Sequence, residues 1–222
     1  MIASIDESGN PSVNDPLPFV LSIALIQDEE GYKEAYENIS LKLFNKMRIF
    51  KYSADKPKKD EPKGVNVKGL FIDSISPYVS SISIVIEKHE DIKNLVIETY
   101  GKLIANHLSE LIVNNPGSSK IKVVYDRVPL FTSSDKQFIT TNFYRWMKVA
   151  KSLRPHVVVD LSGKDRDIWI SAADYVAGIT RDSVLCGKGL VIREYCNLVE
   201  DWIGLLKPKI RSYTTEEVKV LR

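Results

Sequence analysis

The chain has 222 residues, of which 44% are hydrophobic and 27% are charged. This composition is typical of a folded globular protein and excludes a disordered chain. Lys and Arg total 31 and Asp and Glu total 29, so the net charge is only +2. That balance excludes a histone-like basic coat, and any affinity for nucleic acid must come from local patches. The length favours a single domain spanning residues 1–222.

The chain has two cysteines, Cys186 and Cys196. They are too few for a disulfide framework or a structural zinc site, so we expect two buried, reduced thiols. The N-terminal residues lack the basic and apolar segments of a signal peptide. The apolar runs are far shorter than the roughly 20 residues that span a bilayer. The sequence therefore predicts a soluble cytoplasmic protein that does not bind membranes.

The hydrophobic pattern predicts strands and helices along the whole chain. In chain order, we expect strands at 1–5 and 18–26, helices at 29–47 and 67–75, a strand at 80–87, a helix at 92–112, a strand at 121–125, a helix at 134–149, a strand at 155–159, and helices at 168–185 and 190–206. Strands alternate with helices, except that the first two strands are adjacent and are expected to form a hairpin. This order predicts a layered α/β fold with a mixed sheet whose later strands are parallel.

Two segments stand outside this alternation. Residues 51–68 contain six lysines and two prolines, which predicts a Lys-rich surface loop. The C-terminal helix is followed by a basic tail, so that residues 190–222 form a helix and a tail. Apolar residues of that helix are expected either to form a homodimer face or to cap the core; they are Trp202, Ile203, Leu205 and Leu206.

Aspartates follow three of the predicted strands: Asp6, Asp126 and Asp160. In open α/β sheets, ligands bind beyond the carboxyl ends of the parallel strands. A fourth aspartate, Asp174, lies in a helix of small and apolar residues, where an unpaired carboxylate is costly. Carboxylates without His or Cys suit a hard cation, and two such ions can clamp the oxygens of a phosphodiester. The pattern indicates metal-assisted phosphodiester cleavage.

Each of these carboxylates also has an ordinary structural explanation. A strand-terminal Asp commonly caps a helix or forms a turn. For Asp160 the turn is favoured, because Ser162, Gly163 and Lys164 follow it. Asp174 is alternatively a buried Asp that is satisfied by the backbone or by an arginine.

Four segments together resemble a known family: IDESGNP at 5–11, FVLSIAL at 19–25, VVYD at 123–126 and ADYVAGI at 173–179. In this order they are similar to the family called domain of unknown function 3800, which is regarded as ribonuclease H-like. The resemblance implies a five-stranded mixed sheet with antiparallel first strands, flanked by helices. It also implies a divalent-metal-dependent nuclease that hydrolyses phosphodiester bonds in RNA or DNA.

The resemblance also implies the site residues. Asp6, Asp126 and Asp174 are expected to bind Mg²⁺ or Mn²⁺ and, with Glu7, to be catalytic. Glu98 is the positional candidate for a further metal ligand, and Glu7 is the alternative for that place. The ordinary explanation of Glu98 is a solvated surface residue on its helix.

Basic residues are the candidates for binding the substrate. Arg127 directly follows Asp126, and Lys164 lies close to the end of a predicted strand. Lysines of the Lys-rich loop would supply non-specific, salt-dependent affinity for a phosphate backbone; they are Lys56, Lys58 and Lys59. Surface salt bridges and a solvated loop are the competing explanations.

Two other functions fit the same sequence. One is a catalytically inactive module that binds nucleic acid or protein, because a fold does not determine a function. The other is a PIN-like nuclease, which also uses acidic residues at strand ends but predicts an all-parallel sheet. Convergence of the Asp6, Asp126 and Asp174 carboxylates within about 4–6 Å would favour a nuclease over a binding module.

Overall fold

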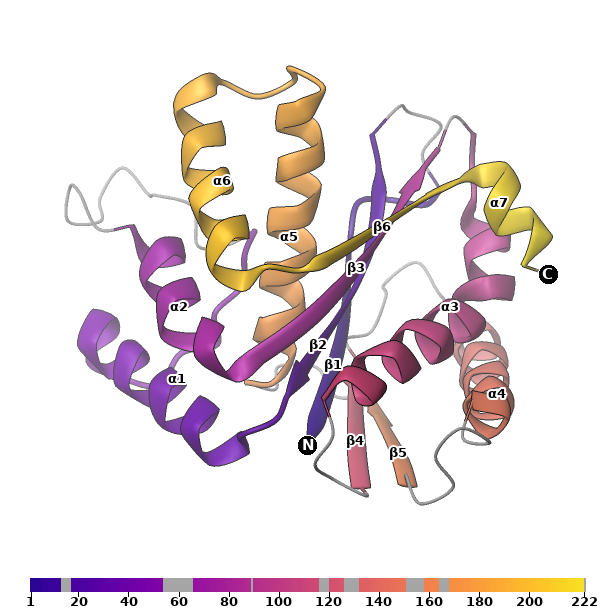
Figure 1. Ribbon diagram of the computed structural model, residues 1–222, viewed down its shortest axis with the longest axis horizontal. Helices are drawn as coiled ribbons and strands as arrows, with labels where there is room; N and C mark the ends of the chain where they lie inside the picture. The colour runs from indigo at the N-terminus through magenta and orange to yellow at the C-terminus, as the bar shows by residue number, and fades with distance from the viewer. Residues whose placement is uncertain are drawn as a thin grey trace.

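The computed structural model describes residues 1–12, 17–53, 66–88, 90–115, 120–125, 132–150, 158–163 and 168–221. Its strands and helices, in chain order, are β1 (Ile2–Ser8), β2 (Phe19–Ile26), α1 (Glu29–Phe44), α2 (Val67–Ile75), β3 (Val79–Glu87), α3 (Lys93–Asn114), β4 (Lys120–Tyr125), α4 (Ser133–Ala150), β5 (Val158–Gly163), α5 (Ile170–Gly187), α6 (Arg193–Leu206), β6 (Lys209–Thr214) and α7 (Thr215–Val220). All the predicted helices are present, and only their ends differ. A twisted sheet lies between two layers of helices (Figure 1). One layer contains α1, α2, α5 and α6, and the other contains α3, α4 and α7.

The sheet has the strand order β5-β4-β1-β2-β3-β6. The strand β1 lies inside it, antiparallel to β2 and parallel to β4. On either side, β3 is antiparallel to β2, and β5 is parallel to β4. The five predicted strands therefore form a mixed sheet with an antiparallel first pair, as expected. These pairings contradict the all-parallel sheet that a PIN-like nuclease predicts.

A sixth strand, β6, extends the described sheet at the edge next to β3. The sequence predicts only a basic tail here, because KIRSYT lacks the strict alternation of a half-buried strand. Most of β6 is exposed, and its residues Lys209 and Arg211 form ion pairs with Glu110 of α3. The strand forms because β3 supplies partners for its backbone groups. The described sheet thus has six strands rather than five.

Two strand boundaries change the position of candidate carboxylates. The strand β1 continues to Ser8, so Asp6 lies inside the strand and not after its end. The strand β5 starts at Val158 rather than at residue 155, and it includes Asp160. The prediction of a turn at Ser162, Gly163 and Lys164 is therefore wrong for Ser162 and Gly163, which belong to the strand.

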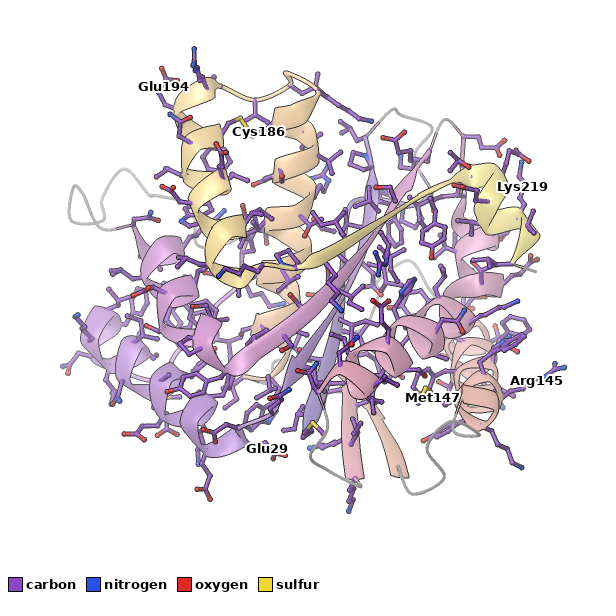
Figure 2. The ribbon with its side chains drawn as sticks, in the orientation of Figure 1. Glu29, Arg145, Met147, Cys186, Glu194 and Lys219 are labelled. Carbon is purple, nitrogen blue, oxygen red and sulfur yellow. A yellow bond between two sulfur atoms is a disulfide. The ribbon has the colours of Figure 1, made fainter. Side chains whose placement is uncertain are left out.

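Each face of the sheet carries its own apolar core. Residues alternate along β1, so Ala3 and Ile5 pack toward α3 and α4, whereas Ile2 packs toward α1, α2 and α5. Figure 2 shows Met147 where α4 meets α3, and it shows Arg145 on the outer side of α4. The same alternation decides which face the carboxylates of β1 occupy.

The two cysteines form a disulfide between the end of α5 and the start of α6. The expectation of two buried, reduced thiols is therefore wrong. The turn between the two helices brings the Cα atoms to 5.6 Å, within the range that a disulfide bridges. A cytoplasmic location stays a prediction, and reduced thiols no longer support it. None of the helices in the described ranges is long and apolar enough to cross a membrane.

Candidate functional site

Asp6 is a buried carboxylate in the interior of the sheet, with 8% of its surface exposed. Its side chain faces α5, because Ile2 of the same strand belongs to the core on that face and residues alternate. Its Oδ1 atom accepts a hydrogen bond from the backbone N–H of Glu7 at 2.8 Å. A carboxylate this buried is costly unless hydrogen bonds or a cation offset its charge.

A row of hydroxyl groups continues from Asp6 across the sheet beneath α5. Asp6 is paired with Ser22 of β2, and Ser22 is paired with Ser83 of β3. The hydroxyl oxygens of Ser22 and Ser83 are 2.7 Å apart, and Ser83 lies 2.8 Å from the hydroxyl of Thr180 in α5. These buried hydrogen bonds fix α5 against the strands next to Asp6.

Asp174 is half-buried on α5, and its Oδ2 atom accepts a hydrogen bond from the backbone N–H of Tyr52 at 2.6 Å. The alternative explanation, that the backbone satisfies Asp174, is thus confirmed for one of its two oxygen atoms. A carboxylate has about four acceptor positions, so this bond is compatible with a metal-ligand role.

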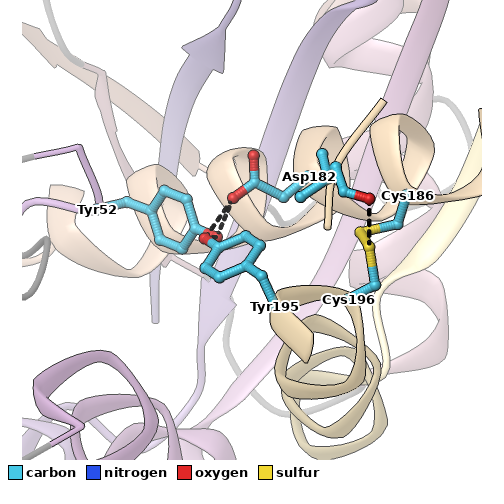
Figure 3. The surroundings of a disulfide bond; sticks show 6 residues. Tyr52, Asp182, Cys186, Tyr195 and Cys196 are labelled. Atoms are coloured by element: carbon cyan, nitrogen blue, oxygen red, sulfur yellow. Dashed lines mark hydrogen bonds between the residues drawn. A yellow bond between two sulfur atoms is a disulfide. The ribbon is translucent and has the colours of Figure 1, made fainter. Parts of the chain in front are cut away.

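Tyr52 is held against α5 at its backbone by Asp174 and at its hydroxyl by Asp182, and Figure 3 shows the hydroxyl end. Its hydroxyl donates to Oδ2 of Asp182 at 2.5 Å, and the hydroxyl of Tyr195 donates to the same atom at 2.7 Å. Burial, followed by the charge of Asp182, raises the pKa of Tyr52 far above its ordinary value, so this phenol stays protonated. The ammonium of Lys68 lies 3.3 Å from the centre of the Tyr52 ring. Lys68 is therefore a buried residue of α2, not part of an exposed loop.

The two candidates for the additional acidic ligand, Glu7 and Glu98, lie on the other side of the sheet. The carboxylate of Glu7 accepts a hydrogen bond from the hydroxyl of Tyr100 in α3. Glu98 is an exposed residue of the same helix. The described structure thus assigns Asp6 and Asp174 to the α5 side and Glu7 and Glu98 to the α3 side.

The six remaining candidates all lie outside the described residues; they are Asp126, Arg127, Lys164, Lys56, Lys58 and Lys59. The described part of β4 ends at Tyr125, which is paired with Ile5. Among the described residues, no group of three or more His, Cys, Asp or Glu is arranged to hold a metal ion. Convergence of the three aspartates and binding of Mg²⁺ or Mn²⁺ therefore stay predictions.

Sequence reasoning missed two residues near Asp6 and Asp174. Tyr52 is 122 positions away from Asp174, and no pattern in the chain connects them. Arg181 follows Asp174 by seven residues, about two helical turns, so the spacing already put both on one side of α5. Its surroundings are described below.

No protein-family model matches the chain, and no curated protein matches it either. The chain is similar to a ribonuclease HII from Archaeoglobus fulgidus, solved in complex with PCNA. The two chains are 13% identical, with a TM-score of 0.47, and the match covers 92% of this chain and 89% of the other. At this TM-score the similarity supplies no argument about the site, which depends on the geometry above.

Proposed function

We propose that the protein is a divalent-metal-dependent nuclease with a ribonuclease H-like fold, in the family called domain of unknown function 3800. It would hydrolyse phosphodiester bonds in nucleic acid. The proposal depends on one observation: Asp6 lies buried beneath α5, and α5 itself carries Asp174. The mixed sheet with its antiparallel first pair supports the proposed fold.

The alignment of β1 with α5 supports placing the carboxylates of Asp6 and Asp174 at the same height along these two elements. A Cβ atom at Gly9 would lie 3.6 Å from Nε of Arg181, and both elements rise in the same direction in Figure 1. Asp6 precedes Gly9 by three residues, about 10 Å along a strand. Asp174 precedes Arg181 by seven residues, about 10.5 Å along a helix. The two lengths are nearly equal.

The donor set fits a hard divalent cation, because it consists of carboxylate oxygens and includes no His or Cys. Asp6 and Asp174, with Asp126 as the predicted third ligand, would hold Mg²⁺ or Mn²⁺. When bound, such ions stabilise charge on phosphoryl oxygens and lower the pKa of the attacking water.

The residues of the chain would prepare this site in two ways. Packing of α5 on β1 keeps bulk water from Asp6, which strengthens its attraction for a cation or a cationic side chain. The backbone N–H of Tyr52 holds Asp174 in one orientation, and Asp182 and Tyr195 in turn hold Tyr52. Held carboxylates lose less freedom when they bind, so a preorganised site binds and acts more effectively.

Cleavage of labelled single-stranded RNA, single-stranded DNA, duplex DNA and an RNA–DNA hybrid tests the proposal. We expect cleavage with Mg²⁺ or Mn²⁺, none with EDTA, and a loss of at least about 100-fold in Asp174→Asn. The Asn side chain keeps an oxygen that can accept the N–H of Tyr52, so the fold should survive. Asp201→Asn, an exposed change on α6, is the matched control. Equal cleavage by Asp174→Asn and wild type would refute the proposed catalytic role.

A binding module without turnover is the second candidate, because a fold does not determine a function. It predicts binding of the same nucleic acids without cleavage under any metal condition. Measuring binding and cleavage on the same samples separates the two functions.

A further inference from the structure

Arg181 is an arginine of α5 that has no hydrogen-bond or ion-pair partner among the described residues. Its Nε atom is buried and forms no hydrogen bond. Among the residues described here, no carboxylate forms an ion pair with its guanidinium. Buried side-chain donors nearly always have a partner, so the unbonded Nε atom of Arg181 is unusual. The hydrogen-bond donors of Arg181 are therefore not used by the described fold, which leaves them available to a ligand.

The two acidic residues on this part of α5, Asp182 and Asp174, do not form an ion pair with Arg181. Asp182, the next residue, accepts hydrogen bonds from the hydroxyls of Tyr52 and Tyr195. Asp174 lies about 10.5 Å away along the helix axis, beyond the reach of an ion pair. Neither of these two acids of α5 therefore pairs with Arg181.

The turn that follows β1 lies next to Arg181. Gly9 directly follows β1 and has a φ of +103°, which disfavours any residue with a side chain. A Cβ atom there would also lie 2.6 Å from the carbonyl oxygen of Pro18, which is too close. A Cβ atom at Gly9 would lie 3.6 Å from Nε of Arg181, an ordinary contact distance, so Nε lies beside this turn, three residues beyond Asp6.

Phosphate is the chemical group that this arrangement suits. A guanidinium has five N–H donors in a planar fork and binds phosphate oxygens in pairs. Arg181 is half-buried, and its Nε atom is the buried part that forms no hydrogen bond, so the proposed contact is made by the rest of the guanidinium. We propose that Arg181 binds a backbone phosphate of the nucleic acid, next to the phosphate that is cleaved at Asp6 and Asp174. This inference rests on the proposed function for that site.

Binding without cleavage tests the inference directly. In EDTA, fluorescence anisotropy measures the Kd of wild type, Arg181→Gln and Arg181→Lys for fluorescein-labelled single-stranded RNA, single-stranded DNA and duplex DNA. We expect Arg181→Gln to bind at least one probe about 10- to 100-fold more weakly, the range for lost hydrogen bonds to a charged group. Its slope of log Kd against log salt should fall by about one. Arg181→Lys should lose less, because it keeps the charge but not the fork.

Arg193→Gln is the matched control, because Arg193 is exposed at the start of α6. It should bind every probe as wild type does. Urea unfolding of Arg181→Gln should show unchanged or greater stability, since folding gains no partner from Arg181. An unchanged Kd and salt slope in Arg181→Gln would overturn the inference, as would wild type that binds none of the probes.

The two proposals fail separately in these assays. If wild type does not cleave but Arg181→Gln loses binding, the nuclease proposal is wrong and the phosphate contact stands. If cleavage depends on Asp174 while Arg181→Gln binds as tightly as wild type, only the contact of Arg181 is wrong.

Discussion

Replacing Gly178 with alanine tests how Tyr52 is held against α5. An ideal Cβ atom at Gly178 would lie 2.5 Å from Cγ and 2.7 Å from Cε1 of the Tyr52 ring. Atoms in folded proteins do not approach this closely, so the ring has to move. The ring cannot move freely, because Asp174 holds its backbone and Asp182 holds its hydroxyl.

The size of the effect follows from three contributions. Overpacking costs about 1–3 kcal/mol, and loss of one hydrogen bond to a carboxylate costs about 1.5–3 kcal/mol. Alanine is favoured over glycine inside a helix by roughly 0.5–1 kcal/mol. We therefore expect Gly178→Ala to lower the free energy of unfolding by about 1.5–5.5 kcal/mol.

Equilibrium unfolding in urea, followed by far-ultraviolet circular dichroism, measures this difference. Gly204→Ala is the matched control, since Gly204 is exposed in α6 and a Cβ atom there meets nothing within 4 Å. It should raise the free energy of unfolding by roughly 0.5–1 kcal/mol. If Gly178→Ala stabilises the protein as Gly204→Ala does, the packing of Tyr52 on α5 is refuted. Cleavage by Gly178→Ala should also fall, because Tyr52 orients Asp174.

Two further predictions concern the disulfide and a buried histidine. Cys186→Ser opens a loop whose cysteines are 10 positions apart, so it should lower the free energy of unfolding by about 2–3 kcal/mol. Dithiothreitol should lower the free energy of unfolding of wild type by the same amount and leave that of the variant unchanged. A loss of stability in both proteins would show that the disulfide is not the cause. Burial lowers the pKa of His107 below its ordinary value of 6.5, and Glu110 offsets part of that shift. The unfolded chain then binds the proton more readily, so the free energy of unfolding should fall as pH drops below about 6.5. His107→Gln should flatten this dependence, and an unchanged pH profile in that variant would assign it to other groups.

The candidate site shows what a single sequence can reveal. Asp174 stood out because a carboxylate is unusual in an apolar helix, and it is half-buried. Asp6 stood out because it follows the end of a predicted strand, whereas the structure places it inside β1, where it is buried. Glu7 was not predicted from the sequence to lie on the opposite face of the sheet from Asp6. It adjoins Asp6 in the chain, but adjacent residues of a strand point to opposite faces, so Glu7 contacts Tyr100 of α3.

The chain's own pattern determined the α/β class, the six predicted helices and the antiparallel pairing of β1 with β2. These features depend on local periodicity and on which elements are adjacent, and both can be read along the chain. The near-neutral net charge was also known from the sequence, and any affinity for nucleic acid has to come from local groups, for which Arg181 is the one proposed.

Only the tertiary structure decided the features that join distant segments. The strand β6 forms because β3 offers an unpaired edge, although its own sequence is mostly polar. The disulfide forms because α6 turns back along α5, and Tyr52 reaches Asp174 across 122 positions. Such contacts depend on where whole elements pack. Packing results from many weak interactions along the entire chain, so no short pattern encodes it.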